Sequence, residues 1–349
     1  MVFVRSEDTE PMRANLERWL RQKLPNAEDL GVGPLERSGQ GFSGETHLFQ
    51  MRWRENGQLR SEKLVLRTAT QMFPVFPEYD LGKQFRVMAC LGESDVPVPG
   101  MRWLEETGDV LGVPFYIMEC VGGDMPRSNW HGEGIFYEAD IEKRVRLWNQ
   151  AIAMVARIHA LDWQRLGLSF LGVPANAGDI LGLQLDYWES YLEWAKREPL
   201  SLHEKALDWL KQNRFEPERC CLCWGDPGLH NLVYTDDRVS SVLDWEMAYI
   251  GDPEADLAYF LVLDETIAAN YQTPRLPGLP GEKKTVAYYE SLGSVRISNL
   301  FYHRVFAAFK LAAIAVQVGR CLVESGSGQF PPDLAINNAN THMLETMLG

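Results

Sequence analysis

The sequence predicts a mixed α/β fold in which sheet and helices are largely separate (α+β). We expect a small antiparallel sheet in an amino-terminal lobe and a larger, mainly helical carboxy-terminal lobe. Three observations predict this. Residues 46–53 alternate polar and apolar side chains as a strand does, and a hairpin signal and a second strand follow. Most of the chain after residue 122 carries apolar side chains at helical spacing instead. At 349 residues the chain is long enough to divide, since domains typically hold about 100 to 200 residues.

The composition excludes several classes of protein. An apolar fraction of 46% indicates a folded chain rather than a disordered one. A net charge of -14 and the lack of a basic cluster argue against a nucleic-acid partner. The most apolar stretch, 301–318, is interrupted by charged residues, so we expect neither a membrane span nor a signal peptide, and we predict a cytoplasmic protein. The six scattered cysteines are expected to be reduced and buried. Nothing in the sequence indicates an oligomeric state.

The glycine-rich segment is the first informative motif. An amphipathic helix is expected over 11–24, and residues 39–44 (GQGFSG) then satisfy G-x-G-x-x-G, which fits a dinucleotide-binding turn, a kinase phosphate loop or a simple tight turn. The dinucleotide motif must run into a helix, whereas a strand follows here, then Asn56-Gly57 and a second strand over 63–67. This order indicates the start of a kinase-like lobe and disfavours a dinucleotide-dependent oxidoreductase.

The rest of the first lobe is expected to be a helix and two strands. Residues 80–91 have helical spacing, with polar Gln84 on the apolar face, where it needs a partner. Two strands are predicted over 101–105 and 113–121. Gly122-Gly123 then marks the expected boundary between lobes spanning 1–121 and 122–349.

The second lobe is predicted to be helical, with one small hairpin. A helix is expected to begin at Asp252-Pro253, where an N-cap residue precedes a proline in the first turn. Residues 272–283 are expected to form a loop. The remaining predictions are helices over 145–159, 184–196 and 202–212, a buried helix over 297–322, and short strands over 232–234 and 239–243.

The chemistry is carried by residues 224–231 (WGDPGLHN), here called the catalytic loop, and 243–246 (LDWE), here called the metal loop. Phosphoryl transfer has a loose transition state, so a protein contributes mainly alignment and charge neutralisation. Asp226 can align an acceptor hydroxyl, and Asn231 and Asp244 can hold a hard cation on phosphates. Each could have a turn or cap role alone, but all three at this spacing favour an active centre.

From Glu36 to Phe260 the sequence resembles the aminoglycoside phosphotransferase family of small-molecule kinases, whose catalytic loop is similar to H-G-D-x-x-x-x-N. Residues 243–246 and 251–259 (GDPEADLAY) resemble in particular the branch associated with acyl-CoA dehydrogenases. The resemblance implies a two-lobed protein-kinase-like fold and transfer of the ATP γ-phosphoryl group, with Mg²⁺, to a hydroxyl of a small molecule. The branch suggests a hydroxyacyl or hydroxyacyl-CoA acceptor, and the family name suggests an aminoglycoside.

The resemblance also implies roles for individual residues. Asp226 would be the catalytic aspartate, and Asn231 and Asp244 the magnesium ligands. Arg67 stands where the family usually has a phosphate-binding lysine, and Gln84 where it has a glutamate. The remaining nucleotide contacts would come from a loop over the phosphates, namely Gly41, Phe42, Ser43, Gly44 and Thr46, and from the backbone of a hinge at Glu119 and Val121.

Three departures from the family pattern keep an alternative open. Trp224 replaces the histidine of the motif, and we expect it to be a packing residue beneath the metal loop. Arg67 keeps the positive charge, but Gln84 can offer it only a neutral hydrogen bond. The alternative is therefore a catalytically weakened, nucleotide-binding protein. Asp256 is expected to hydrogen-bond the catalytic loop, and His159 and His230 to be packing and loop residues.

Overall fold

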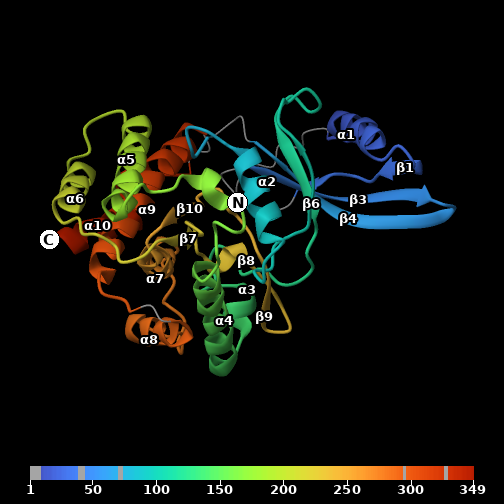
Figure 1. Ribbon diagram of the computed structural model, residues 1–349. Helices are drawn as coiled ribbons and strands as arrows, with labels where there is room; N and C mark the ends of the chain where they lie inside the picture. The colour runs from blue at the N-terminus through green and yellow to red at the C-terminus, as the bar shows by residue number, and fades with distance from the viewer. Residues whose placement is uncertain (1–8, 38–43, 70–73, 294–295, 326–328) are drawn as a thin grey trace. The chain divides into compact units, whose positions relative to one another are not determined.

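The computed structural model describes residues 9–349 apart from 38–43, 70–73, 294–295 and 326–328. The chain divides into two compact units, Met1–Ala89 with Pro99–Val121, and Cys90–Val98 with Gly122–Gly349 (Figure 1). The segment 90–98 was predicted in the first lobe but groups with the second unit. The reason is local bonding, because the C=O of Pro97 accepts from the N–H of Val242 (2.8 Å) and Arg157 donates to the C=O of Asp95 (3.2 Å).

The first unit is built on an antiparallel sheet in the order β1-β3-β4-β6-β5, with β2 paired to β3. The hairpin between β3 and β4 turns at Asn56 and Gly57, whose φ angles of 52° and 76° are both positive, as a type I′ turn requires. The predicted hairpin is thus confirmed. The strands are β1 (Glu28–Val32), β2 (Glu36–Arg37), β3 (Glu45–Glu55), β4 (Gln58–Thr68), β5 (Met101–Glu105) and β6 (Phe115–Glu119).

The first unit also contains helix α1 (Glu10–Lys23) and all but the last two residues of helix α2 (Leu81–Leu91). Helix α1 buries Trp19 and neighbouring leucines in a core shared with β1, β3, β4 and β6. Helix α2 follows Asp80, whose carboxylate accepts from the N–H of Lys83 (2.7 Å) as an N-cap does. Gln84 is buried on the apolar face of α2, as the spacing predicts.

The second unit is mainly helical, as expected, and the long apolar helix α9 packs against α7 in its core. By length and composition α9 could cross a membrane, but 72% of its most apolar window is buried, which is typical of a core helix. The described helices of the unit are α3 (Gly134–Glu138), α4 (Ile141–His159), α5 (Ala177–Ala195), α6 (Ser201–Gln212), α7 (Pro253–Asn270), α8 (Glu282–Leu292), α9 (Leu300–Glu324) and α10 (Ala339–Leu348).

Helices α3 and α10 were not predicted, and α4 and α5 begin earlier than predicted. Two further features of the second unit also differ from the prediction. The segment predicted as a loop over 272–283 ends two residues early, because α8 begins at Glu282 and continues to Leu292. Helix α8 buries little besides Thr285 and Tyr289, so its apolar spacing is weak. In addition, β7 (Cys221–Cys223) pairs with β10 (Tyr249–Gly251) in a ribbon too short to show alternation. The expected hairpin is confirmed as β8 (Leu232–Thr235) and β9 (Arg238–Val242).

Candidate active site

The two small ribbons of the second unit bring the predicted site loops together. The catalytic loop connects β7 to β8, and the metal loop lies between β9 and β10. Because β7 pairs with β10 and β8 with β9, both loops are held at both ends by paired strands. The N–H of Leu243 donates to the C=O of Asn231 (2.9 Å), which joins the loops directly. Asp226, Asn231 and Asp244 therefore lie in one place.

Asp226 is enclosed and hydrogen-bonded on several sides. Its side chain is 18% exposed. Burial raises the pKa of this carboxyl above its usual range, and the nearby charge of Asp244 acts in the same direction. His230 and hydrogen bonds from Asn231 and Tyr259 work against this rise. Asp226 thus keeps a proton to higher pH than an exposed aspartate does.

Asn231 and Asp244 leave oxygen atoms suited to a cation. The amide nitrogen of Asn231 donates to the carboxylate (2.9 Å) and the C=O (3.2 Å) of Asp226, so the amide oxygen remains as its possible ligand atom. Asp244 has a φ of 58°, and its buried Oδ1 has no hydrogen-bond partner among the described residues. An unpaired buried carboxylate oxygen is rare, and a hard cation would satisfy it. The residues present therefore fit Mg²⁺.

Trp224 supports the metal loop from below. It is fully buried, and its indole N–H lies within hydrogen-bonding distance of the C=O groups of Leu243 (2.9 Å) and Asp244 (3.1 Å). Its ring also packs against Trp245, with centroids 5.9 Å apart. The structural role predicted for Trp224 is confirmed.

Asp256 anchors the start of the catalytic loop. This buried carboxylate of α7 accepts from the N–H of Trp224 (2.7 Å) and of Gly225 (3.0 Å), which confirms its predicted role. His159 Nε2 lies 3.1 Å from the same carboxylate, and His159 Nδ1 lies 2.7 Å from the Tyr289 hydroxyl. His159 is therefore part of a buried polar chain and does more than pack. Gly225 has a φ of 89°, which favours glycine.

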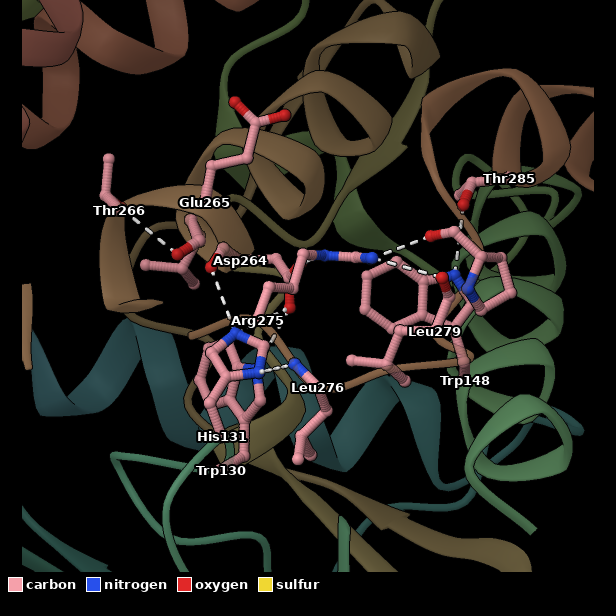
Figure 2. Close-up of polar contacts among 12 residues, drawn as sticks. Trp130, His131, Trp148, Asp264, Glu265, Thr266, Arg275, Leu276, Leu279 and Thr285 are labelled. Carbon is pink, nitrogen blue, oxygen red and sulfur yellow. Dashed lines mark hydrogen bonds and ion pairs between the residues drawn. The ribbon is translucent and has the colours of Figure 1, made fainter. Parts of the chain in front are cut away.

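A second buried network holds the other side of the catalytic loop. The ring of Trp130 lies parallel to that of His230, at 7° and 5.9 Å, and His230 Nε2 is 3.9 Å from Asp226 Oδ2. Figure 2 shows that Trp130 is tied in turn to Asp264, to which its indole N–H donates (3.0 Å). Arg275 also donates to Asp264 (2.5 Å). His230 is thus supported through a chain of contacts from α7.

Charge inside this network favours an ionised Asp264. Burial alone would raise the pKa of Asp264, but contacts with His131 and Arg275 lower it overall. Sequence reasoning missed Asp264 and Trp130, because they are 134 positions apart and share no motif. Tyr259, by contrast, falls within the quoted 251–259 motif, one turn of helix after Asp256, and could have been placed beside the catalytic loop.

In the first unit, three of the predicted nucleotide residues come together. Arg67 donates to the hydroxyl of Thr46 (2.8 Å), its neighbour across β3 and β4. A Cβ at Gly44 would lie 3.1 Å from the Arg67 guanidinium nitrogen, so glycine leaves room for that group. The partner of buried Gln84 is the Tyr116 hydroxyl (3.4 Å). The other predicted loop residues, Gly41, Phe42 and Ser43, lie outside the described residues.

The predicted hinge lies at the end of the first unit. The N–H of Glu119 donates to Gly100 (2.9 Å), and its carboxylate pairs with Arg102 (3.0 Å). The described residues provide no hydrogen-bond acceptor for the N–H of Val121. This N–H could therefore bind a ligand.

Comparison with known proteins gives a family and a set of more distant relatives. The model of the phosphotransferase enzyme family matches residues 44–282. Acyl-CoA dehydrogenase family member 10 of Mus musculus is 28% identical over 312 residues, covering 86% of this chain and 27% of that protein. Acyl-CoA dehydrogenase family member 11 of Gallus gallus is 26% identical over 342 residues, covering 93% of this chain and 41% of that protein. The chain therefore spans well under half the length of these curated relatives.

Solved structures show the same fold. A protein of Ralstonia eutropha JMP134, provisionally described as an aminoglycoside phosphotransferase, has 25% identity and a TM-score of 0.68, with 96% of this chain and 95% of that chain covered. The aminoglycoside phosphotransferase APH(4)-Ia, in a ternary complex with ADP and hygromycin B, has 15% identity and a TM-score of 0.56, with 96% and 98% covered. The two-lobed protein-kinase-like fold predicted from the sequence is confirmed.

Proposed function

Because this chain belongs to the phosphotransferase enzyme family, we propose that it transfers the γ-phosphoryl group of ATP to a hydroxyl group of a small molecule. One observation carries the proposal. The buried Oδ1 of Asp244 has no partner among the described residues, and it lies beside the loop in which Asn231 holds Asp226. A carboxylate that orients a hydroxyl and oxygen atoms that hold a cation are the two parts that phosphoryl transfer needs.

Mg²⁺ bound with ATP is the proposed cofactor. Asn231 would hold it through the amide oxygen and Asp244 through its carboxylate, and the ion would supply charge neutralisation of the phosphates. Solved neighbours of this fold were determined with ADP, AMP-PNP or GDP, so both ATP and GTP belong in the test.

Asp226 is proposed to position the acceptor and to receive its proton. The acceptor oxygen forms a bond to the γ-phosphorus, the bond from that phosphorus to the β–γ bridging oxygen breaks, and ADP leaves. The hydrogen bond from Asn231 orients the Asp226 carboxylate for this step. The raised pKa of Asp226 makes it a better proton acceptor than an exposed aspartate once it is ionised.

The nucleotide is proposed to bind through residues of the first unit. Arg67, placed by Thr46 and Gly44, would contact phosphate oxygens, with Gly41, Phe42 and Ser43 covering them. The backbone of Glu119 and Val121 would pair with adenine. Gln84 would act indirectly, through its bond to Tyr116, which lies opposite Arg67 in the sheet.

The proposed acceptor is a hydroxyacyl compound, free or as its CoA thioester. Its support is the similarity to acyl-CoA dehydrogenase family members over most of this chain. The test is a screen of hydroxyacyl-CoAs, hydroxy acids and aminoglycosides with γ-labelled ATP or GTP and Mg²⁺, with Asp226→Asn as the inactive control. Label transferred to an aminoglycoside alone would refute this acceptor class.

A second candidate is nucleotide binding without transfer. It is favoured by Arg67 and Gln84, which replace the family's lysine and glutamate. Magnesium-dependent ATP binding with no transfer to any acceptor and no hydrolysis would support it, whereas turnover that Asp226→Asn removes would exclude it.

A further inference from the structure

A buried group of soft ligand atoms lies beneath the catalytic loop, apart from the residues proposed for Mg²⁺. His159 at the end of α4 and Cys221 and Cys223 of β7 each offer one ligand atom, and these atoms all lie within 4.8 Å of one another. All three residues are buried. The two cysteines are separated by one residue of a strand, so their side chains share a face. The proposed phosphoryl transfer does not use this group.

The spacing of the sulfur atoms fits a tetrahedral metal ion. Two thiolates at about 2.3 Å from Zn²⁺ are separated by about 3.8 Å in tetrahedral geometry. The Sγ atoms of Cys221 and Cys223 are 4.0 Å apart. Thiolate and imidazole ligands select zinc-like ions, whereas the oxygen atoms of Asn231 and Asp244 suit Mg²⁺. The chain would therefore distinguish two kinds of cation.

The surroundings of His159 also fit a metal ligand. Its Nε2 lies 3.1 Å from the carboxylate of Asp256, and metal-binding histidines typically donate their second ring N–H to a carboxylate. That arrangement leaves Nδ1 as the ligand atom, which faces the Tyr289 hydroxyl at 2.7 Å. Burial raises the pKa of Tyr289, so its hydroxyl is neutral in the metal-free protein.

We propose that His159, Cys221 and Cys223 form a binding site for one thiophilic divalent cation of the Zn²⁺ class, with the Tyr289 hydroxyl or a water as fourth ligand. Binding would replace the hydrogen bond between Tyr289 and Nδ1 and keep the contact of Nε2 with Asp256. Because Asp256 also holds the N–H groups of Trp224 and Gly225, the ion would be linked through one side chain to the catalytic loop.

Binding would release protons. Burial raises the pKa of both thiols, so the metal-free protein holds them protonated, and each must lose its proton to become a ligand. Affinity is therefore expected to rise with pH, because each thiolate ligand forms by loss of a proton. The titratable groups around the thiols are His159, Arg219, Tyr249, Asp252, Asp256, Tyr289 and Lys310.

Cobalt binding to the full chain, with Mg²⁺ in excess, tests the site without reference to phosphoryl transfer. We expect one Co²⁺ per chain with a thiolate-to-cobalt charge-transfer band, displaced by stoichiometric Zn²⁺. The band should weaken in Cys221→Ser and in Cys223→Ser and vanish in the double variant. Cys321→Ser, a change at a buried cysteine of α9, is the matched control and should keep it.

The proposal is overturned if the wild-type protein shows no thiolate band, or if the band survives in the double variant. X-ray absorption at the zinc edge on wild-type protein gives a second measurement that needs no variant. Two sulfur and at least one imidazole ligand are expected, and a shell of oxygen ligands alone would refute the site. Normal nucleotide binding by the serine variants would show that they are folded.

Discussion

Replacement of Asp256 by asparagine tests how the catalytic loop is held. Oδ2 accepts from Trp224 (2.7 Å) and faces His159 (3.1 Å), and Oδ1 accepts from Gly225 (3.0 Å). An amide whose oxygen takes the place of Oδ2 keeps the first two contacts and turns its NH₂ group toward the N–H of Gly225. One bond to a charged acceptor is lost, and a buried donor is left without a partner.

That loss can be estimated. A hydrogen bond to a charged group contributes about 1.5–3 kcal/mol, and an unsatisfied buried donor costs about 1–3 kcal/mol. Because these two energies partly describe the same loss, we expect Asp256→Asn to lower the free energy of unfolding by about 2–4 kcal/mol. Gly225 directly precedes Asp226. If about 1.4–2.7 kcal/mol of this loss falls on the alignment of that side chain, kcat decreases about 10- to 100-fold, with the KM for ATP little changed.

The assays are urea unfolding and steady-state kinetics, and Glu254→Gln is the matched control. Glu254 is also a buried carboxylate of α7 that accepts from two backbone N–H groups, those of Ser298 (2.9 Å) and Asn299 (2.8 Å), but neither belongs to the catalytic loop. We expect it to lose stability without loss of kcat. Full kcat in Asp256→Asn, or equal losses of kcat in both variants, would refute the reasoning.

Three further predictions concern the proposed site. Asp226→Asn should leave nucleotide affinity nearly intact and lower kcat about 10²- to 10⁴-fold. In the wild type, burial raises the pKa of Asp226, so kcat should increase with pH around a pKa above that of an ordinary aspartate. The acid limb of the pH profile of kcat measures this pKa. Asp244→Asn, which tolerates the positive φ, should abolish magnesium-dependent nucleotide binding in calorimetry without lowering stability in the absence of Mg²⁺, and unchanged binding would contradict its role. Arg67→Ala should weaken ATP much more than adenosine, and Arg67→Lys with Gln84→Glu should be milder than Arg67→Lys alone; equal losses for both ligands would show that Arg67 does not contact phosphate.

Local signals account for what the sequence could predict. Asn56-Gly57 specifies its own turn, and Asp252 and Pro253 specify a helix start, because these preferences act over a few residues. The catalytic and metal loops could also be recognised from the sequence, because a single hairpin separates them along the chain. The structure brings Asp226 and Asp244 close together, as this spacing predicts, and their proposed roles in catalysis and metal binding stay predictions.

The features that could not be predicted from the sequence are contacts between segments that are far apart along the chain. The ribbon of β7 and β10 pairs strands of three residues, too short for a periodic pattern. The contact of His159 with Asp256 joins α4 to α7, and that of Trp130 with Asp264 joins the segment before α3 to α7. Residues 90–98 were placed in the wrong unit for the same reason, because Pro97 bonds to Val242 far along the chain.

The contacts of the Trp224 indole indicate which properties a side chain needs at the first position of the catalytic loop. At this position the fold needs a buried donor facing the C=O groups of Leu243 and Asp244, together with enough ring surface to pack on Trp245. Replacing Trp224 by the histidine of the family motif would keep a donor but leave a cavity under the metal loop. The free energy of unfolding is expected to fall, as it does when other large buried side chains are replaced by smaller ones. We expect that enlarging a neighbour of the ring would recover part of this loss in Trp224→His, because this position requires a hydrogen-bond donor and a side-chain volume rather than one particular amino acid.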